Sequence, residues 1–447
     1  MKLNLLSLGC AKNLVDSEGM LNRLSDAGWI LTDEPAEADI IVVNTCGFIE
    51  TAINESIDAI LELAAFREHG NCKRLIVAGC LPQRFGADIA RALPEVDIFL
   101  GTGAFDQIVQ AAEGEIETRN LKPDAPLCVL PDPNASEFAR SYKTGLNWEF
   151  GSHAAYIKVA EGCSRHCTYC IIPKLRGKQR SRTPDDILAQ AWDMIESGVR
   201  ELILIAQDTT GYGSDLQDMP GLGGLLERIS DLSPDIWIRF LYGHPESIDR
   251  AVIRIAAERP NICSYFDIPI QHASTRILKK MGRHYSRGDL YRLFDKIRSA
   301  DPEASLRTTM ITGFPGESDE DFELMLKFAE DIRFDHLGVF TYSDAEDIPS
   351  HRLPGHVPKK TATDRCDRLM SRQSGISLKN NEKYMGKTLR AIVDEKLEAN
   401  LFAGRTMFQS PEVDGLTYIH ADNLDIGSFV RVKITDVLEY DLVGETV

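Results

Sequence analysis

The chain has 447 residues, of which 43% are hydrophobic and 26% are charged. These proportions are typical of folded globular proteins and exclude a disordered or fibrous chain, and the length suggests about three domains. The 68 Asp and Glu residues outnumber the 50 Lys and Arg residues, so the formal net charge is −18 at pH 7. Such a field repels phosphate backbones and attracts basic partners, which argues against a protein whose main task is binding nucleic acid.

Cysteine content and hydropathy indicate the compartment. Ten cysteines are too few for a disulfide scaffold, and the absence of a long apolar run predicts no membrane span. The apolar start, residues 3–9, is short and contains Asn4 and Ser7, so it indicates a first strand and not an export signal. We therefore expect a cytoplasmic protein without membrane contact, whose clustered cysteines serve metal binding or catalysis.

Residues 1–120 alternate between short apolar runs and helical periodicity, which predicts a doubly wound α/β domain with a parallel sheet. The candidate strands are residues 3–8, 39–43, 74–78 and 96–100, and the candidate helices are residues 17–27 and 53–65. Residues 121–150 break this pattern, because four prolines stand among Asp, Asn and Ser with little periodicity. They predict a linker or an irregular segment.

A second alternating series over residues 151–378 predicts six strand–helix units, a partial TIM-like (βα)6 barrel, since about eight units are needed for closure. Its candidate strands are residues 155–160, 201–205, 236–241, 265–270, 305–311 and 336–342, and a polar helix is expected over residues 359–381. Residues 379–447 then predict a small OB-like barrel of five short strands. These are residues 388–394, 401–408, 416–420, 428–437 and 440–446.

Three cysteines, Cys163, Cys167 and Cys170, follow the first expected barrel strand with the spacing C-x-x-x-C-x-x-C. A 4Fe–4S cluster is normally held by four thiolates, so three thiolates leave one iron open for the amino and carboxylate groups of S-adenosylmethionine. Loops at the carboxyl ends of the strands also form the active sites of such barrels. Zinc with His166 as a fourth ligand is the alternative, but structural zinc sites usually take their ligands from two separated pairs.

A second set of cysteines stands out by its position. Cys10, Cys46 and Cys80 each follow an expected strand of the first domain and have a glycine beside them. In an open parallel sheet ligands bind beyond the carboxyl ends of the strands, so we expect these thiols to share one crevice and a second three-thiolate cluster. Three independent buried cysteines are the alternative. The remaining cysteines, Cys72, Cys128, Cys263 and Cys366, are expected to be small hydrophobic residues or incidental surface thiols.

The three-cysteine loop resembles that of the radical S-adenosylmethionine superfamily. Together with the N-terminal cysteine domain and a C-terminal barrel that looks like a TRAM domain, the whole chain resembles the methylthiotransferase family. The segments that carry this resemblance jointly are residues 8–13, 176–182, 269–274 and 313–317.

The family has a branch that modifies an adenosine of tRNA and a RimO-type branch that modifies an aspartate of small-subunit ribosomal protein S-twelve. Residues 8–18, LGCAKNLVDSE, and residues 271–274, QHAS, look RimO-like. Residues 381–447 contain seven Lys or Arg against twelve Asp or Glu, a balance of −5. That balance suits a basic protein better than RNA, unless the acidic residues only keep the domain soluble. A tRNA adenosine methylthiotransferase is the alternative function, and a non-enzymatic zinc-containing RNA-binding protein is a more distant one.

The resemblance implies an S-adenosylmethionine-dependent transferase that inserts sulfur and a methyl group at the β-carbon of an aspartate of S-twelve, giving 3-methylthioaspartate. It implies two 4Fe–4S clusters, one on Cys163, Cys167 and Cys170 and one on Cys10, Cys46 and Cys80, the second holding an exogenous sulfide. The implied partners are S-twelve, free or in the ribosome, an electron donor such as flavodoxin, and a sulfur source. Contact with nucleic acid is expected to be at most secondary.

Further cofactor contacts are expected at the active-site face of the predicted barrel. They are Tyr169, Arg182, Gln207, Gly313, Gly316 and Glu317. The alternatives are packing at the barrel mouth for Tyr169 and a plain βα turn for residues 313–317. Asp208, next to Gln207, is equally explained as a helix cap.

A basic run precedes the second barrel strand. Its members are Lys174, Arg176, Lys178, Arg180 and Arg182. They alternate, so an extended segment would place them on one face, where they could hold a cofactor carboxylate, the target carboxylate or an acidic electron donor. A solvated charged face is the commoner explanation of such a run.

Overall fold

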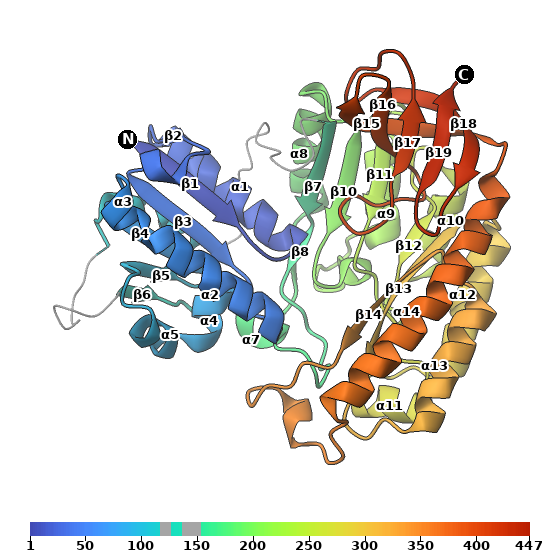
Figure 1. Cartoon of the computed structure of the whole chain (residues 1–447), viewed down its shortest axis with the longest axis horizontal. Helices are drawn as coiled ribbons and strands as arrows, with labels where there is room; N and C mark the ends of the chain where they lie inside the picture. The colour runs from blue at the N-terminus through green and yellow to red at the C-terminus, as the bar shows by residue number, and fades with distance from the viewer. Residues whose placement is uncertain (117–126, 136–152) are drawn as a thin grey trace. The chain divides into compact units, whose positions relative to one another are not determined.

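The computed structural model describes residues 1–116, 127–135 and 153–447 (Figure 1). The described residues form two compact units. Unit 1 comprises the described part of Met1–Thr144 together with Ala160–His166 and Cys170–Arg180, and unit 2 comprises the remainder. The segment that carries the C-x-x-x-C-x-x-C motif therefore contributes residues to both units.

The described part of unit 1 is built on a six-stranded parallel sheet of order β2-β1-β3-β4-β5-β6, blue to teal in Figure 1. The strands are β1 (Lys2–Ser7), β2 (Ile30–Leu31), β3 (Ile40–Thr45), β4 (Arg74–Gly79), β5 (Ile98–Leu100) and β6 (Leu127–Val129). The helices are α1 (Ala11–Asp26), α2 (Glu50–Ala64), α3 (Phe66–His69), α4 (Cys80–Phe85), α5 (Ala87–Ala92), α6 (Ile108–Glu113) and α7 (Ile172–Arg176). All six residues of β3 are buried, as expected for a central strand of a sheet covered on both faces. The doubly wound α/β domain is confirmed.

Two strands of this sheet differ from the expectation. β2 has two residues, too few to show a periodicity in the sequence. β6 arises inside the segment expected to be irregular, because Leu127, Cys128 and Val129 form a short apolar run that pairs in parallel with β5. The expectation of an irregular segment is therefore wrong for these residues. The parts of that segment at residues 121–126 and 136–150 lie outside the described residues.

The first part of unit 2 contains the six expected parallel strands in two sheets, β11-β10-β7 and β12-β13-β14. An isolated parallel bridge between Ile238 and Ile262 joins β11 to the residues just before β12. The strands are β7 (Ala154–Lys158), β10 (Glu201–Ile205), β11 (Trp237–Phe240), β12 (Tyr265–Asp267), β13 (Ser305–Thr312) and β14 (His336–Thr341). The helices are α8 (Pro184–Glu196), α9 (Leu222–Ser230), α10 (Arg250–Glu258), α11 (Thr275–Lys280), α12 (Arg287–Ala300), α13 (Asp319–Ile332) and α14 (Lys359–Asn381). They confirm the partial barrel.

Residues 388–446 form a closed barrel of order β15-β16-β17-β19-β18, red in Figure 1, as the sequence predicts. The strands are β15 (Thr388–Glu398), β16 (Leu401–Thr406), β17 (Thr417–His420), β18 (Phe429–Val437) and β19 (Leu442–Thr446). Inward side chains such as Val393, Phe402 and Ile419 form its core.

Among the helices that the structure describes, none is long and apolar enough to cross a membrane.

A buried ion network joins the closed barrel to the parallel strands within unit 2. Glu201 accepts from Arg239 Nε at 2.8 Å and from Arg405 Nη1 at 2.6 Å, and Arg405 Nε also bonds Asp394 at 2.8 Å. The side chains of Glu201 and Arg239 are 0% exposed. Burial alone would raise the pKa of Glu201, but the two guanidinium groups lower it below its ordinary value.

Candidate functional site

Cys10, Cys46 and Cys80 follow the carboxyl ends of three neighbouring strands, β1, β3 and β4. The strands are parallel, so the three thiols lie at one edge of the sheet, as predicted. They are close enough that the charges of Cys80 and Cys10 both raise the pKa of Cys46, although burial is its larger cause. The structure therefore brings this predicted set together within unit 1.

Glycines allow the cysteine-bearing turns to approach one another. Gly9 has φ +99°, and a Cβ placed on it would lie 2.9 Å from the Cβ of Cys46. A Cβ on Gly47 would lie 2.8 Å from the backbone carbonyl carbon of Cys80. Such contacts are closer than side chains tolerate, so the compact arrangement of the thiols depends on glycine at these positions.

The three thiols differ in how readily they ionise. Burial raises the pKa of Cys46 to about 11, and burial also raises the pKa of Cys80, against the opposing charge of Arg176. For Cys10 desolvation by the neighbouring atoms raises the pKa, but the charges of Lys12 and Arg176, together with backbone N–H groups of Asn13 and Lys12, outweigh it, so the pKa is lowered. Cys10 is also the exposed member of the set. It is therefore the thiol best prepared to act as a thiolate.

Buried amide side chains hold the cysteine turns in place. The Nδ2 of Asn13 donates to the carbonyls of Leu8 and Thr45, each at 3.0 Å, and so ties the turn after β1 to the end of β3. The Nδ2 of Asn44 donates to the Asn13 carbonyl at 2.8 Å and to Ser17 Oγ at 2.9 Å. No local pattern in the sequence marks Asn44 as a member of this network, whereas Asn13 and Ser17 lie within the RimO-like segment 8–18.

Arg176 reaches the same network from α7. Its Nη1 lies 2.6 Å from Asp16 Oδ2 and its Nη2 lies 3.5 Å from Cys80 Sγ, and Nη2 also donates to Asn13 Oδ1. The expected extended basic face is therefore wrong at residues 174–176. Pro173 favours the first turn of a helix, and helical rotation of about 100° per residue separates side chains that an extended chain would align.

Cys163, Cys167 and Cys170 lie in the loop between β8 (Ala160–Glu161) and α7, each half-buried. The backbone N–H of Arg165 donates to Cys163 Sγ at 3.5 Å, and that of Ile172 donates to Cys170 Sγ at 3.4 Å. Backbone donors of this kind stabilise thiolate sulfur and help to set the potential of an iron–sulfur cluster. His166, the alternative zinc ligand, is exposed.

Tyr169 in this loop is held by residues that follow α11. Its hydroxyl accepts from Arg283 Nε at 3.2 Å and from Arg283 Nη2, and the guanidinium carbon lies 5.8 Å from the ring centroid. The ring packs on the buried cluster that contains Met281 and Phe314. Packing at the barrel mouth is therefore confirmed for Tyr169, whereas its contact with a cofactor stays a prediction. Arg283 has no signal in the sequence that would have identified it.

Residues 313–317 form the turn between β13 and α13. Gly313 has φ +76° and donates its N–H to Glu317 Oε2 at 3.0 Å, and Gly316 has φ +82°. Glu317 Oε1 accepts from Arg365 Nη1 at 2.6 Å, and its Oε2 lies 3.3 Å from His272 Nε2. His272 Nδ1 accepts the backbone N–H of Ser274 at 2.8 Å, and its Nε2 faces Glu317. The two family-like segments 269–274 and 313–317 thus meet through these side chains.

Arg182 is 4% exposed and its guanidinium is occupied within unit 2. It bonds Asp186 at 2.7 Å, the Lys158 carbonyl at 3.0 Å and Gln190 at 2.6 Å. Gln207 is half-buried after β10, and Asp208 caps the short helix Thr209–Gly211 by accepting the Gly211 N–H at 2.9 Å. Capping is therefore confirmed for Asp208. Cofactor contact by Arg182 and Gln207 stays a prediction.

The donor sets fit iron–sulfur clusters in their chemistry. Each set offers three thiols. Among the described residues, no three thiol, imidazole or carboxylate side chains converge where one metal ion could bind. The thiolates of a 4Fe–4S cluster bind different irons, so their sulfurs surround the cluster and do not meet at one ion. The cationic Lys12 and Arg176 beside the first set suit a group of negative charge.

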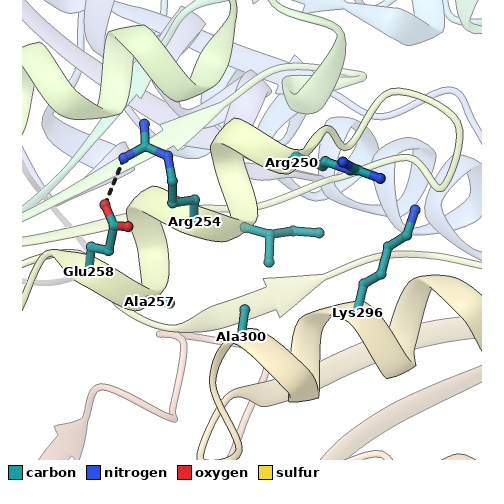
Figure 2. A pocket seen from close by; sticks show the side chains of 7 residues that line it. Arg250, Arg254, Ala257, Glu258, Lys296 and Ala300 are labelled. Carbon is teal, nitrogen blue, oxygen red and sulfur yellow. Dashed lines mark hydrogen bonds and ion pairs between the residues drawn. The ribbon is translucent and has the colours of Figure 1, made fainter.

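A cavity on the outside of the partial barrel has no cysteine of either set in its lining. It is lined by α10 and α12 and includes Arg250, Arg254, Glu258 and Lys296 (Figure 2). Arg254 Nη1 lies 2.7 Å from Glu258 Oε2, and both side chains are 55% exposed. None of the predicted site residues lines this cavity.

Three family models match successive parts of the chain. They are the Uncharacterized protein family UPF0004 at residues 2–101, the Radical SAM superfamily at residues 157–329 and the TRAM domain at residues 385–447. Among solved structures, the radical S-adenosylmethionine methyltransferase TsrM from Kitasatospora setae superposes with a TM-score of 0.57 at 13% identity, covering 78% of this chain and 77% of that one. This likeness supports the fold.

Curated relatives match along the full length. The relative from Desulfosudis oleivorans is 50% identical over 446 residues, covering 100% of both chains. Those from Clostridioides difficile and Geobacter sulfurreducens are 45% and 43% identical and cover 100% of this chain and 98% of theirs. All three are named ribosomal protein uS12 methylthiotransferase RimO. The chain therefore belongs to the RimO family of radical S-adenosylmethionine methylthiotransferases.

Proposed function

We propose that this enzyme transfers a methylthio group to the β-carbon of an aspartate in ribosomal protein uS12, giving 3-methylthioaspartate. The single observation that carries the proposal is the 50% identity, over the full length, to the uS12 methylthiotransferase of Desulfosudis oleivorans. The balance of −5 charges in residues 381–447 supports a basic protein as the substrate. Contact with ribosomal RNA is secondary in this proposal, and the enzyme acts in the cytoplasm.

We assign the radical cluster to Cys163, Cys167 and Cys170. These thiolates would hold a 4Fe–4S cluster, which would supply the electron for reductive cleavage of the sulfonium of S-adenosylmethionine. The backbone donors of Arg165 and Ile172 stabilise thiolate at Cys163 and Cys170. We propose that Tyr169, Arg182, Gln207, Gly313, Gly316 and Glu317 shape or contact the cofactor pocket. Glu317 and Arg182 do so by bracing the backbone, because their charges are bonded within the protein.

We assign a second 4Fe–4S cluster, the auxiliary cluster, to Cys10, Cys46 and Cys80. Three thiolates leave one iron open, where an exogenous sulfide can bind. Asn13 and Asn44 fix the turns that carry the thiols, and the exposed Cys10 marks the side from which sulfide enters. An external sulfur source and an electron donor such as flavodoxin are the further partners.

We also propose domain boundaries at residues 1–120, 151–378 and 379–447, with a connecting segment between the first two.

Mass spectrometry of a deletion strain tests the function. Ribosomal protein uS12 from the strain should lack the mass of one methylthio group on an aspartate, and expression of this chain should restore it. The tRNA of the same strain, digested to nucleosides, should keep its methylthio-adenosines. Unchanged uS12 together with loss of a methylthio group from tRNA overturns the proposal in favour of the tRNA branch.

A further inference from the structure

Arg176 connects the two cysteine-bearing segments of unit 1. It is the last residue of α7, which follows Cys170 closely in the chain. Its guanidinium lies 3.5 Å from Cys80 Sγ and 2.6 Å from Asp16 Oδ2, and both carboxylate oxygens of Glu161 lie 3.5 Å from its Nη1. The residue therefore belongs by sequence to the radical-cluster segment and by contact to the auxiliary site.

The guanidinium is fixed in charge and in place. Its side chain is 3% exposed and that of Asp16 is 4% exposed. Arginine keeps its proton in proteins, and carboxylate oxygens of Asp16 and Glu161 lie within 3.5 Å of its guanidinium. An isolated buried charge is strongly unfavourable, so this arrangement requires the anionic partners that surround it.

We propose that Arg176 is a positioning residue for the auxiliary cluster. This inference rests on the auxiliary cluster proposed above. Its guanidinium orients the Cys80 thiolate and sets the reduction potential of the cluster through a buried positive charge. Reduction adds one electron to an already negative group, which a nearby cation stabilises, and a hydrogen bond to the ligand sulfur acts in the same direction. The effect is strong in the interior because solvent screens buried charges little.

The test isolates the auxiliary cluster in the full chain. Cys163, Cys167 and Cys170 are replaced by Ala, the cluster is reconstituted, and its midpoint potential is measured by titration with dithionite followed by electron paramagnetic resonance. One electron passes from the reductant to the cluster, and no bond forms or breaks. Arg176→Met, Arg176→Lys and Asp16→Asn are compared in this background, with iron per chain measured for each.

The proposal predicts shifts of opposite sign. Arg176→Met removes a positive charge and moves the potential to more negative values, Arg176→Lys moves it less, and Asp16→Asn removes a negative charge and moves it to more positive values. Arg67→Met is the matched control, because Arg67 pairs with Asp97 before β5, at the opposite edge of the sheet, and should leave the potential unchanged. A purely structural role for Arg176 would not reverse the sign between Arg176→Met and Asp16→Asn.

Each outcome separates this inference from the proposed function. If the background chain binds no iron, the auxiliary cluster itself is refuted. If it binds roughly four irons and all variants keep the background potential, the auxiliary cluster stands and the role of Arg176 is refuted. If Arg176→Met loses the cluster, the signs found for Arg176→Lys and Asp16→Asn decide: a negative and a positive shift support the inference, and any other pair overturns it.

Discussion

Gly79 packs so closely against Asn44 that a Cβ on Gly79 would overlap with Asn44 Oδ1. The backbone at Gly79 has φ +103° and ψ −148°, a region that residues with a side chain rarely enter. Gly79 directly precedes Cys80, and Asn44 lies in the strand that precedes Cys46. This contact therefore sets how closely two of the three auxiliary thiols approach.

Gly79→Ala should destabilise unit 1 and prevent loading of the auxiliary site. Backbone strain costs about 1–3 kcal/mol, and overpacking against Asn44 adds a cost of about the same size. Gly28→Ala is the matched control, because Gly28 also has a positive φ of +87° but a Cβ added there would meet no described atom within 4 Å beyond its chain neighbours. Denaturation of the apo protein and iron per chain measure both effects; equal results for the two variants would contradict the packing argument.

Cys10 should react with iodoacetamide at a lower pH than Cys46 in the apo protein. The thiolate is the nucleophile, so the lowered pKa of Cys10 exposes it to alkylation at a pH where Cys46, with a pKa of about 11, is still protonated. The pH at half-maximal rate, read for each peptide by mass spectrometry, separates ionisation from accessibility. Lys12→Met should raise that pH for Cys10 and leave Cys46 nearly unchanged. A Cys46 midpoint at or below that of Cys10 is incompatible with this prediction.

Substitutions in the two cysteine sets should abolish different steps of the reaction. Cys163→Ala should abolish formation of 5′-deoxyadenosine, whereas Cys46→Ala should stop thiolation of uS12 while some cofactor cleavage survives. Iron per chain should fall from roughly eight to roughly four in each variant. Cys366→Ala is the control, because that thiol donates to the Val339 carbonyl at 3.6 Å and belongs to neither cysteine set, so the variant should keep both activities. Full methylthiolation by Cys46→Ala would remove the second cluster from the proposed function.

Glu201→Gln should destabilise unit 2 strongly. It leaves Arg239 buried beside a neutral amide and Arg405 with Asp394 as its remaining carboxylate partner, and breaking a buried ion pair costs about 3–5 kcal/mol. Glu258→Gln removes the exposed pair with Arg254 (Figure 2) and should cost at most about 1 kcal/mol. Chemical denaturation followed by tryptophan fluorescence compares them, and similar losses would contradict the role of the buried network.

The stability that Glu201 contributes to unit 2 has a defined pH dependence. The pKa of Glu201 is lower in the folded protein than its ordinary value. Its contribution to stability is therefore complete above the ordinary pKa of about 4.3 and is lost as the pH falls through the lower folded pKa. The stability difference between the wild-type chain and Glu201→Gln should narrow in acid; a difference that widens would show that the charge of Glu201 is not what stabilises unit 2.

Local pattern was enough to predict most of the elements. The helix expected over residues 359–381 is α14 with the same bounds, and each of the six expected barrel strands overlaps an observed strand. Apolar periodicity and turn residues act over a few positions, so the sequence displays them directly. β6 was missed for the same reason: three residues between prolines carry too little pattern to stand apart from a loop.

The sequence by itself determined which thiols belong together, because parallel strands bring their carboxyl ends to one edge and Cys10, Cys46 and Cys80 all stand at such ends. It could not assign Arg176, which contacts Asp16 from 160 positions away along the chain. That contact depends on α7 turning a basic run into a helix and directing one guanidinium into a buried network. Only the tertiary structure decided this, because the partners of a buried charge are set by long-range packing and leave no local periodicity in the sequence.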